Sequence, residues 1–468
     1  MRAAGDRATI APSAQAAGRV VVPGDKSISH RYAMLAALAD GESVIHGYSR
    51  GADCAATLEC VRALGVDVQR RGELILIRGL GREGLRRPLA PLDAANSGTT
   101  MRLMSGILAG QPFLTQFTGD ESLRRRPMRR IIDPLQRMGA TVTSADGFPP
   151  LTIQGTALKG IIHRSAAPSA QVKSCVLLAG LYAEGTTVVE EPVATRDHTE
   201  RALETFQLLV VRSHGRVAVE GGQALTAREL HVPGDISGAA FWGALAAGMP
   251  GGHVVVEHVG LNPTRTDLLD ILRRAGAEVM VTPVGVGPTF RSGVTESPVG
   301  VGPTFGSGVT DSAEPIGSVV IAHGETASFT IEPGEVPGVI DEIPALAALA
   351  AMMPPGRTLT VRGARELRVK ESDRIASLAA GFRAMGAQVD EFEDGFRLEA
   401  RPLHGAMVDA AGDHRLAMAF AIAATRASGP VTILGASAVD VSYPGFFDTL
   451  ERLTQGGSVG PKVRRPRR

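Results

Sequence analysis

The hydrophobic and polar positions of the chain follow a pattern that recurs along most of its length. A run with helical spacing ends in an apolar residue, a glycine follows, and an alternating strand pattern begins after it. Glycine suits this point because it adopts the positive φ that turns a helix end into the next strand. The copies are VRALGVDV from Val61, LQRMGATV from Leu135, LRRAGAEV from Leu272 and FRAMGAQV from Phe382, with weaker ones near Leu203, where Gln207 replaces the glycine, and near Leu450. The pattern predicts six similar α/β units.

A second, longer repeat divides the chain into two halves. Val22-Pro23-Gly24-Asp25 is matched by Val232-Pro233-Gly234-Asp235, and an apolar, alanine-rich helical run follows each copy. Lys26 and Arg31 of the first copy are replaced by Ile236 and Phe241 in the second. The two repeats together predict a duplicated α/β protein with three units in each half, in which the first half alone keeps these cations.

One interval between the units is longer than the others, and a direct repeat of 15 residues accounts for it. VGVGPTFRSGVTESP from Val284 is followed at once by VGVGPTFGSGVTDSA from Val299. This stretch is rich in Gly, Pro, Ser and Thr and has few side chains that could pack, so we expect a surface insertion at about 281–315. We also expect the basic residues at about 460–468 to form a disordered tail.

Composition narrows the function classes. With 468 residues the chain is long enough for more than one domain, and its net charge of +1 gives no overall field for nucleic acid or an anionic membrane. Three cysteines without zinc-type spacing indicate a reducing compartment. We find neither a secretory signal in residues 1–20 nor an uncharged apolar run of membrane-spanning length. We therefore expect a cytoplasmic monomer that acts on small molecules, with no nucleic acid and no membrane as partners.

The densest charged stretch is RVKESDR, from Arg368 to Arg374. If it enters a helix, Lys370 and Arg374 lie four residues apart and share a face, which makes a strong site for a phosphate or a carboxylate. Glu371 beside them could move a proton if its pKa is raised towards neutrality. The alternative is a solvated helix face with internal ion pairs.

Further charged residues stand at the starts of predicted segments in both halves. Brought together in a cleft, they suit two small, highly anionic substrates and proton transfer between them. The cations are Lys26, Arg31, Arg126, Lys370, Arg374 and Arg415, and the acids are Asp341 and Glu371. The sequence has no clustered His and Cys ligands, no Ser-His-Asp motif and no glycine-rich nucleotide loop after a strand. We therefore expect no metal and no cofactor.

Eight phrases along the chain resemble the 5-enolpyruvylshikimate-3-phosphate synthase family. They come in the order typical of the family, and they span the chain from Val21 to about Leu450. The phrases are PGDKSISHR, NSGTTMR, RRRPM, SAQVKS, TRDHTER, DEIPAL, RVKESDR and DHRLAM. The first and the seventh are the most specific.

The resemblance implies a fold and a reaction. The fold is a two-domain inside-out α/β barrel with three βαβαββ units per domain. Domain I would comprise residues 1–24 and 234–468, domain II residues 25–233, and the active site would lie in the cleft between them. The reaction is transfer of the enolpyruvyl group of phosphoenolpyruvate to the 5-hydroxyl of shikimate 3-phosphate, with release of phosphate, through a non-covalent tetrahedral intermediate. The resemblance also implies a role in aromatic amino-acid biosynthesis and makes the enzyme a candidate glyphosate target. Gly98 leaves room for the inhibitor, as in sensitive members, whereas SAQVKS with TRDHTER resembles a tolerant branch, so both responses stay open.

The resemblance assigns roles to residues one position at a time. In these roles, Asp341 would accept the proton of the attacking hydroxyl, and Glu371 together with Lys26 would protonate the methylene carbon. Shikimate 3-phosphate would be bound by Lys26, Ser27, Arg31, Ser169, Gln171, Arg196, Asp341 and Lys370. Phosphoenolpyruvate would be bound by Lys26, Gly98, Arg126, Gln171, Arg374 and Arg415.

One departure and two alternatives qualify these expectations. Val441 stands where other members have a lysine, so one phosphoenolpyruvate contact is missing or replaced. The related enzyme that uses UDP-N-acetylglucosamine typically has a loop cysteine and a Lys-Asn pair, whereas this chain has Lys26-Ser27 and no cysteine between Gly98 and Arg126. A catalytically silent binding protein on the same scaffold is the other alternative, and the presence of Lys26, Asp341 and Glu371 argues against it.

Overall fold

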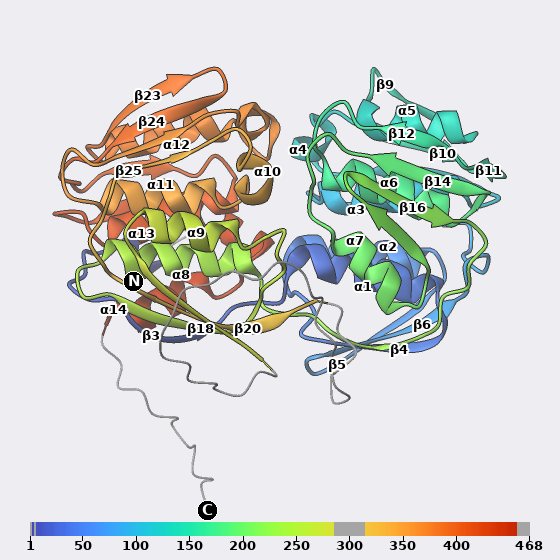
Figure 1. The fold of residues 1–468 in the computed structure, drawn as a ribbon, viewed down its shortest axis with the longest axis horizontal. Coiled ribbons are helices and arrows are strands. Elements are labelled where there is room, and N and C mark those ends of the chain that lie inside the picture. The colour runs from blue at the N-terminus through green and yellow to red at the C-terminus, as the bar shows by residue number, and fades with distance from the viewer. Residues whose placement is uncertain (1, 4–5, 285–313, 456–468) are drawn as a thin grey trace, which may run out of the picture.

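The computed structural model describes residues 2–3, 6–284 and 314–455. Most of the expected insertion and the whole of the expected basic tail lie outside these residues. Two hydrophobic cores are found, one within residues 28–232 and the other within residues 8–22 and 236–453. We call the first part the continuous lobe and the second the split lobe. The two lobes stand side by side in Figure 1, the split lobe on the left and the continuous lobe on the right.

Each lobe has three helices inside and sheets outside, among the residues described. The inner helices of the continuous lobe are α1 (Lys26–Leu38), α3 (Gly98–Ala109) and α6 (Ala170–Gly180). Those of the split lobe are α8 (Ile236–Gly248), α11 (Ile343–Met352) and α13 (His414–Ala424). Every residue of α8 and α11 is buried, and these helices consist mainly of small and apolar residues. A helix that is apolar on all sides belongs in a core, which explains why the chain is rich in alanine and glycine.

Close packing of the inner helices depends on glycine at one contact. A Cβ on Gly106 of α3 would lie 2.2 Å from the backbone oxygen of Cys175 in α6, closer than two such atoms can approach. The two helices therefore meet backbone to backbone at this point.

Amphipathic helices and short helical turns cover the remaining surfaces. In the continuous lobe they are α2 (Ala52–Ala63), α4 (Glu121–Arg124), α5 (Arg129–Met138) and α7 (His198–Thr205). In the split lobe they are α9 (Asp267–Arg274), α10 (Val336–Val339), α12 (Arg374–Ala384), α14 (Phe446–Thr454) and the 3₁₀ helices η1 (Arg365–Val369) and η2 (Ala436–Val441).

The described strands of the continuous lobe form three four-stranded sheets and a two-stranded one. The first, in spatial order, is β17 (Glu229–His231), β4 (Asp40–His46), β6 (Leu74–Leu80) and β5 (Asp67–Arg71). The second is β7 (Leu92–Asp93), β8 (Leu114–Thr118), β10 (Phe148–Gln154) and β9 (Thr141–Ala145). The third is β12 (Ile162–Arg164), β14 (Thr186–Glu190), β16 (Arg216–Glu220) and β15 (Val210–Ser213), and the short pair is β11 (Leu158–Lys159) with β13 (Ala183–Glu184).

The split lobe repeats this plan with three four-stranded sheets in its described part. The first is β19 (Glu278–Pro283), β20 (Ile316–Ala322), β18 (His253–Gly260) and β3 (Ala17–Val21). The second is β21 (Phe329–Ile331), β22 (Thr358–Val361), β24 (Gly395–Glu399) and β23 (Gln388–Phe392). The third is β1 (Arg2–Ala3), β2 (Arg7–Ile10), β26 (Val431–Leu434) and β25 (Met407–Asp409), so the N-terminal strands complete the last unit.

The βαβαββ unit is plain in the middle of each lobe. In the continuous lobe it runs β7, α3, β8, α5, β9 and β10, with the short α4 added. In the split lobe it runs β21, α11, β22, α12, β23 and β24, with α10 and η1 added. The inside-out α/β fold with repeated βαβαββ units is thus confirmed.

The two lobes exchange a strand where the chain passes between them. Strand β3 pairs in parallel with β18 of the split lobe, yet the chain continues from β3 into α1 of the continuous lobe. Strand β17 pairs in parallel with β4 of the continuous lobe and continues into α8 of the split lobe. At the crossing, the Asp25 amide donates to the Pro233 carbonyl (2.7 Å) and the Asp235 amide donates to the Pro23 carbonyl (2.9 Å). The repeated Pro-Gly-Asp phrase therefore marks two crossovers that are hydrogen-bonded to each other.

Candidate active site between the lobes

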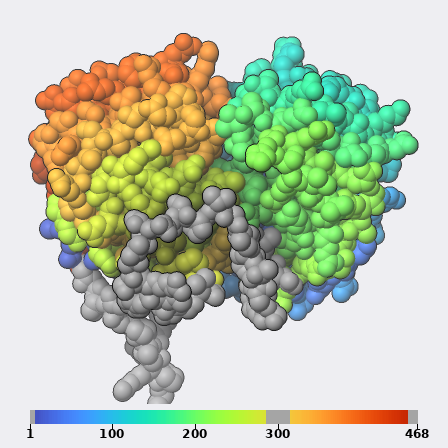
Figure 2. Space-filling model, viewed as in Figure 1, coloured from blue at the N-terminus to red at the C-terminus, as the bar shows by residue number. Residues whose placement is uncertain are grey.

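A cleft of about 420 Å³ lies where the lobes face each other, and Figure 2 shows the furrow between them. Both lobes line it with charged and polar side chains. Predicted site residues in its lining are Ser169, Gln171, Arg196, Asp341 and Lys370. Arg102 and Arg130 of the continuous lobe and Glu366 of the split lobe also line it.

Five of the six inner helices begin within two residues of a predicted site residue, and α8, which begins at Ile236, is the exception. In the continuous lobe, α1 begins at Lys26, α3 at Gly98, and α6 next to Ser169. In the split lobe, α11 begins two residues after Asp341, and α13 begins next to Arg415. A helix N-terminus has unpaired N–H groups and the positive end of the dipole, so it attracts anions.

Asp341 is the acid at which cations of both lobes meet. Its carboxylate lies 2.6 Å from the Arg196 guanidinium of the continuous lobe. From the split lobe, Arg374 is at 3.5 Å, Arg415 at 3.9 Å and Lys370 at 4.0 Å. Burial opposes ionisation, but Arg196, Arg415, Lys370 and Arg374 together hold the pKa of Asp341 well below its usual range. Without bound anions, Asp341 is therefore ionised and is a weak base.

Arg374 is fixed by acids although it is almost fully buried, with 1% of its side chain exposed. Its Nε donates to Asp413 Oδ2 at 2.7 Å, and its Nη2 donates to Glu371 Oε2 at 2.6 Å. Asp413 also caps α13, since its Oδ1 accepts the Arg415 amide at 2.9 Å. One carboxylate thus positions both Arg374 and the start of the helix that carries Arg415.

The ionisation of Glu371 differs from the sequence-based hypothesis of a raised pKa. Burial opposes its ionisation, but Arg374, His414, Arg126 and Lys26 hold the pKa of Glu371 well below its usual value. The sequence placed Lys370 and Arg374 beside Glu371 but could not show that Lys26 and Arg126 of the other lobe also lie near it. A proton-donor role for Glu371 therefore requires bound anions that neutralise these cations.

The predicted shared helix face of RVKESDR is also wrong. Arg374 is the first residue of α12, whereas Lys370 directly follows η1, so the two are not on one helix. They nevertheless converge, because both approach Asp341 Oδ1. The two residues therefore come together around Asp341 and not through a shared helix face.

Lys26 lies between an acid of its own lobe and one of the other. Its Nζ is 2.5 Å from Asp53 Oδ2, and Asp53 is 5% exposed. Burial opposes the charge, but Asp53 and then Glu371 raise the pKa of Lys26. Asp53, on α2, was missed because nothing in its local sequence marks it as the partner of Lys26.

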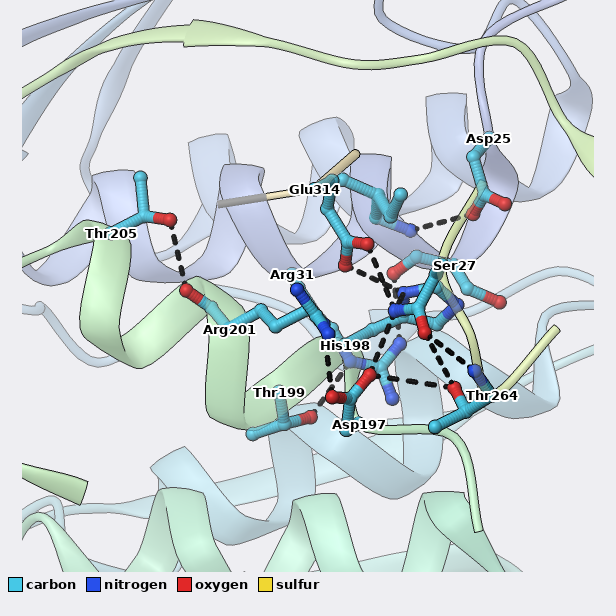
Figure 3. A network of polar contacts seen from close by, with 12 residues as sticks. Asp25, Ser27, Arg31, Asp197, His198, Thr199, Arg201, Thr205, Thr264 and Glu314 are labelled. Carbon is cyan, nitrogen blue, oxygen red and sulfur yellow. Dashed lines mark hydrogen bonds and ion pairs between the residues drawn. The ribbon is translucent and has the colours of Figure 1, made fainter. Parts of the chain in front are cut away.

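The guanidinium group of Arg31 donates three hydrogen bonds within the continuous lobe. Its Nη1 donates to the Ser27 carbonyl at 2.8 Å, its Nε to Thr199 Oγ1 at 2.7 Å and its Nη2 to Ser174 Oγ at 2.7 Å. Figure 3 shows Arg31 with Ser27 and Thr199 near the start of α7. Burial lowers the pKa of Arg31 to about 10, so the guanidinium remains charged at neutral pH. The predicted pair Ser27 and Arg31 is thus joined directly.

Three of the predicted phosphoenolpyruvate residues, Gly98, Arg126 and Gln171, lie around Arg102. Arg102 Nη1 donates to Gln171 Oε1 at 2.5 Å, and Gln171 Nε2 donates to Thr99 Oγ1 at 2.9 Å. A Cβ on Gly98 would lie 3.1 Å from Arg102 Nη1 and 3.4 Å from Arg126 Nη1. Arg102 was not singled out from the sequence, although it ends the phrase NSGTTMR that pointed to this loop.

Val441, where the family lysine was expected, ends η2. A Cβ on Gly51 would lie 2.4 Å from the Val441 carbonyl, so the backbones touch here. The adjacent Tyr443 packs into the core and accepts a hydrogen bond from Trp242 Nε1 at 2.9 Å.

A buried polar network joins the lobes beside Arg31 (Figure 3). Asn262 of the split lobe donates to Asp197 Oδ1 at 2.7 Å and to Glu314 Oε2 at 2.9 Å. Glu314 Oε1 lies 2.7 Å from His198 Nδ1, and both side chains are 2% exposed. Because Asp197 and His198 directly follow Arg196, this network holds the cleft-lining segment against the split lobe.

Replacing Asn262 by alanine is expected to weaken the binding of a phosphorylated ligand across the cleft by at least about tenfold and to change kcat less. The substitution removes two hydrogen bonds to carboxylates, each worth about 1.5–3 kcal/mol, so the loss of one bond that is specific to the closed arrangement already exceeds the about 1.4 kcal/mol of a factor of ten. Titration with the phosphorylated ligand by calorimetry measures the effect. Gln223→Ala is the control, because Gln223 bonds to Leu209 within one lobe. Equal affinity in both variants would show that the network does not favour the closed arrangement.

Anion-binding groups from two lobes, around a cleft in an inside-out α/β fold, define a transferase that joins two small anions. Residues 10–450 match the family model described as EPSP synthase (3-phosphoshikimate 1-carboxyvinyltransferase). The chain therefore belongs to the EPSP synthase family. It is an enzyme of the shikimate pathway, and it transfers the carboxyvinyl group of phosphoenolpyruvate to shikimate 3-phosphate.

Individual relatives are similar over nearly the whole chain. The 3-phosphoshikimate 1-carboxyvinyltransferase of Solibacter usitatus (strain Ellin6076) is 46% identical, and the match covers 95% of this chain and 99% of the relative. That of Synechococcus sp. (strain JA-3-3Ab) is 44% identical, with 97% and 98% covered. A solved EPSP synthase from Acinetobacter baumannii is 40% identical and has a TM-score of 0.80, with 96% of this chain and 98% of that chain covered. Separately, no helix in residues 2–3, 6–284 and 314–455 has the length and apolarity to cross a bilayer.

Proposed function

We propose that the reaction takes place in the cleft between the lobes, and that residues 1–24 with 234–468 and residues 25–233 act as two closing domains. The supporting observation is that Asp341 of the split lobe pairs at 2.6 Å with Arg196 of the continuous lobe. Neither lobe alone contains this arrangement. The crossovers at Pro23 and Pro233 are the expected hinges, and closure would exclude water from the reacting groups.

In this proposal shikimate 3-phosphate lies across the starts of α1 and α6. Its 3-phosphate is bound by hydroxyl, amide and cationic groups, and its ring hydroxyls lie near Asp341. The residues proposed for it are Lys26, Ser27, Arg31, Ser169, Gln171, Arg196, Asp341 and Lys370. Support comes from the cleft lining, which contains Ser169, Gln171, Arg196, Asp341 and Lys370.

In this proposal phosphoenolpyruvate binds beside shikimate 3-phosphate, against charged groups of both lobes. Lys26, Gly98, Arg126 and Gln171 approach it from the continuous lobe, and Arg374 and Arg415 from the split lobe. Arginine pairs with carboxylate and phosphate through two parallel hydrogen bonds, which suits both ends of this substrate. Arg374 Nη1 and Arg126 Nε are buried without a hydrogen-bond partner among the described residues, so they have donors to offer.

The chemistry balances with two proton transfers. Asp341 takes the proton of the 5-hydroxyl as this oxygen attacks C2 of phosphoenolpyruvate, while Glu371 with Lys26 protonates C3. The product is a non-covalent tetrahedral intermediate. Loss of a proton from its methyl group and cleavage of the C–O bond to phosphate then give the enol ether and inorganic phosphate. The surrounding cations stabilise the phosphate as it leaves.

Substrate binding also solves the problem posed by the low pKa values of both acids. Each anionic group that takes a cation away from Asp341 or Glu371 raises the pKa of that acid towards the range useful for proton transfer. Both acids are thus inactive until the anions arrive.

Release of inorganic phosphate tests the proposed substrates directly. We expect turnover when phosphoenolpyruvate and shikimate 3-phosphate are both present. Release with UDP-N-acetylglucosamine as acceptor would instead support the related transferase, and binding without release would support a silent scaffold.

We further propose that the enzyme acts as a cytoplasmic monomer. Three buried free cysteines are consistent with a reducing compartment, and light scattering after size exclusion would measure the mass.

A further inference from the structure

Three potential metal ligands gather on the outer face of the β17–β4 sheet, outside the proposed active site. His46 ends β4, and Glu229 and His231 alternate along β17, so all three point to the same side. Their ligand atoms lie within 4.8 Å of one another. His46 Nε2 is 2.8 Å from Glu229 Oε1, and the two imidazole rings are stacked with centroids 4.4 Å apart.

The backbone fixes this cluster. His46 and His231 are direct partners in the parallel register of the two strands, so the separation of their Cα atoms is set by the sheet. The side chains remain reachable, since 34% of the His46 side chain and 68% of the Glu229 side chain are exposed. Ligand atoms bound to one Zn²⁺ at about 2.0–2.2 Å are about 3.3 Å apart, and small side-chain rotations would achieve this spacing.

The duplicated half of the protein shows that the fold does not require these residues. Positions 229 and 231 correspond in the repeat to Arg19 and Val21, and Glu257 pairs with Val21 as His46 pairs with His231. There, Arg19 and Glu257 form a simple exposed ion pair at 2.6 Å, and Val21 is 62% exposed. Two histidines and a glutamate therefore stand in one copy where the other has Arg19, Val21 and Glu257.

We propose that His46, Glu229 and His231 form a binding site for a divalent transition-metal ion, Zn²⁺ being the best match. Two imidazoles and one carboxylate with a position left for water are a donor set that suits Zn²⁺ far better than Mg²⁺ or Ca²⁺, which take oxygen ligands. The ion would clamp β4 to β17 directly before the crossover. Val232, next to His231, already donates its amide to the His46 carbonyl at 2.9 Å, so the ion would reinforce an existing junction.

Calorimetric titration of the tag-free full-length enzyme with Zn²⁺ tests the proposal. We expect one saturable site and a melting temperature that rises with Zn²⁺, because an ion that binds only the folded protein stabilises it. His231→Val should weaken binding at least about tenfold, since even changes around the ligands of a metal cost 10–100-fold. The variant should fold, because Val21 occupies the matching position. Co²⁺ should give the visible absorption of a tetrahedral site in the wild type and not in His231→Val.

Two further variants make the outcome decisive. Glu229→Gln should also weaken Zn²⁺ binding, and its exposed position makes a folding defect unexpected. His214→Asn is the matched control on an exposed turn, and it should bind Zn²⁺ as the wild type does. Absence of saturable binding in the wild type, or equal binding by wild type, His231→Val and Glu229→Gln, would overturn the proposal.

Discussion

Replacing Asp341 by asparagine is expected to lower kcat by about 10²–10⁴-fold, the usual contribution of a positioned acid or base. Asparagine keeps the shape of the side chain but cannot take the proton of the attacking hydroxyl. The rate of phosphate release at saturating concentrations of both substrates measures the loss. Substrate affinity should change less than kcat, because most cations proposed to bind the two anions remain in place.

The same substitution should change stability in a way that depends on ligand. Asp341 neutralises Arg196, Lys370, Arg374 and Arg415 in the ligand-free protein, so its loss leaves these cations to repel one another. We expect a lower melting temperature without substrate and partial recovery with shikimate 3-phosphate, whose anionic group replaces the lost charge.

Glu366→Gln is the matched control for Asp341→Asn. Glu366 also lines the cleft and also joins the lobes, through Arg130 at 2.6 Å, but both side chains are more than 40% exposed. An exposed pair of this kind contributes little, so kcat should change by only a small factor. If Asp341→Asn and Glu366→Gln behaved alike, Asp341 would be no more than a bridge between the lobes.

Local sequence patterns predicted much of the fold. Gly65, Gly139, Gly276 and Gly386, predicted as helix ends, all have positive φ. Gln207, predicted at the same point of the weaker copy, has φ +66° although it is not glycine. Repetition of the unit thus identified a strained position that composition alone would have missed. The apolar, alanine-rich runs after the two Pro-Gly-Asp phrases likewise predicted helices, and α1 and α8 lie there in the core.

What the sequence could not supply is the pairing of residues far apart in the chain. Asp53 with Lys26 and Asp413 with Arg374 are contacts between segments whose local sequence gives no sign of each other. The exchange of β3 and β17 between the lobes is of the same kind, as is the His46 and His231 pair. The absence of clustered metal ligands in the sequence therefore did not exclude a cluster in space.

The ionisation of Glu371 has the same origin. From RVKESDR alone, only the charges of neighbouring residues in the chain can be seen to act on Glu371, and a pKa raised by burial is one possible outcome. In the structure the largest influence that opposes burial is Arg374 of the same phrase, and it is reinforced by His414, Arg126 and Lys26, which lie in three other segments. The sign of a pKa shift depends on the three-dimensional arrangement of charges, which local sequence does not contain.

Glu371→Gln is expected to keep substrate binding while lowering kcat by about 10²–10⁴-fold. Arg374 Nη2 can still donate to the glutamine oxygen that replaces Glu371 Oε2, so the binding geometry should be retained. What is lost is the proton for C3 of phosphoenolpyruvate. A direct signature follows, because protonation in D₂O places deuterium on the methylene carbon, and this incorporation should fall with kcat in the variant.

Glu393→Gln is the control for this change, since Glu393 pairs with Arg365 at 3.0 Å and 76% of each side chain is exposed. It should retain both turnover and deuterium incorporation. Near-normal turnover in Glu371→Gln would rule out the proton-transfer role. Slow turnover with undiminished deuterium incorporation would instead assign the donor to Lys26, whose ammonium group is held beside Glu371 by Asp53. Protonation of C3 thus tests the ligand-dependent rise in the pKa of Glu371. If Glu371 stayed ionised in the complex with both substrates, it could not donate this proton.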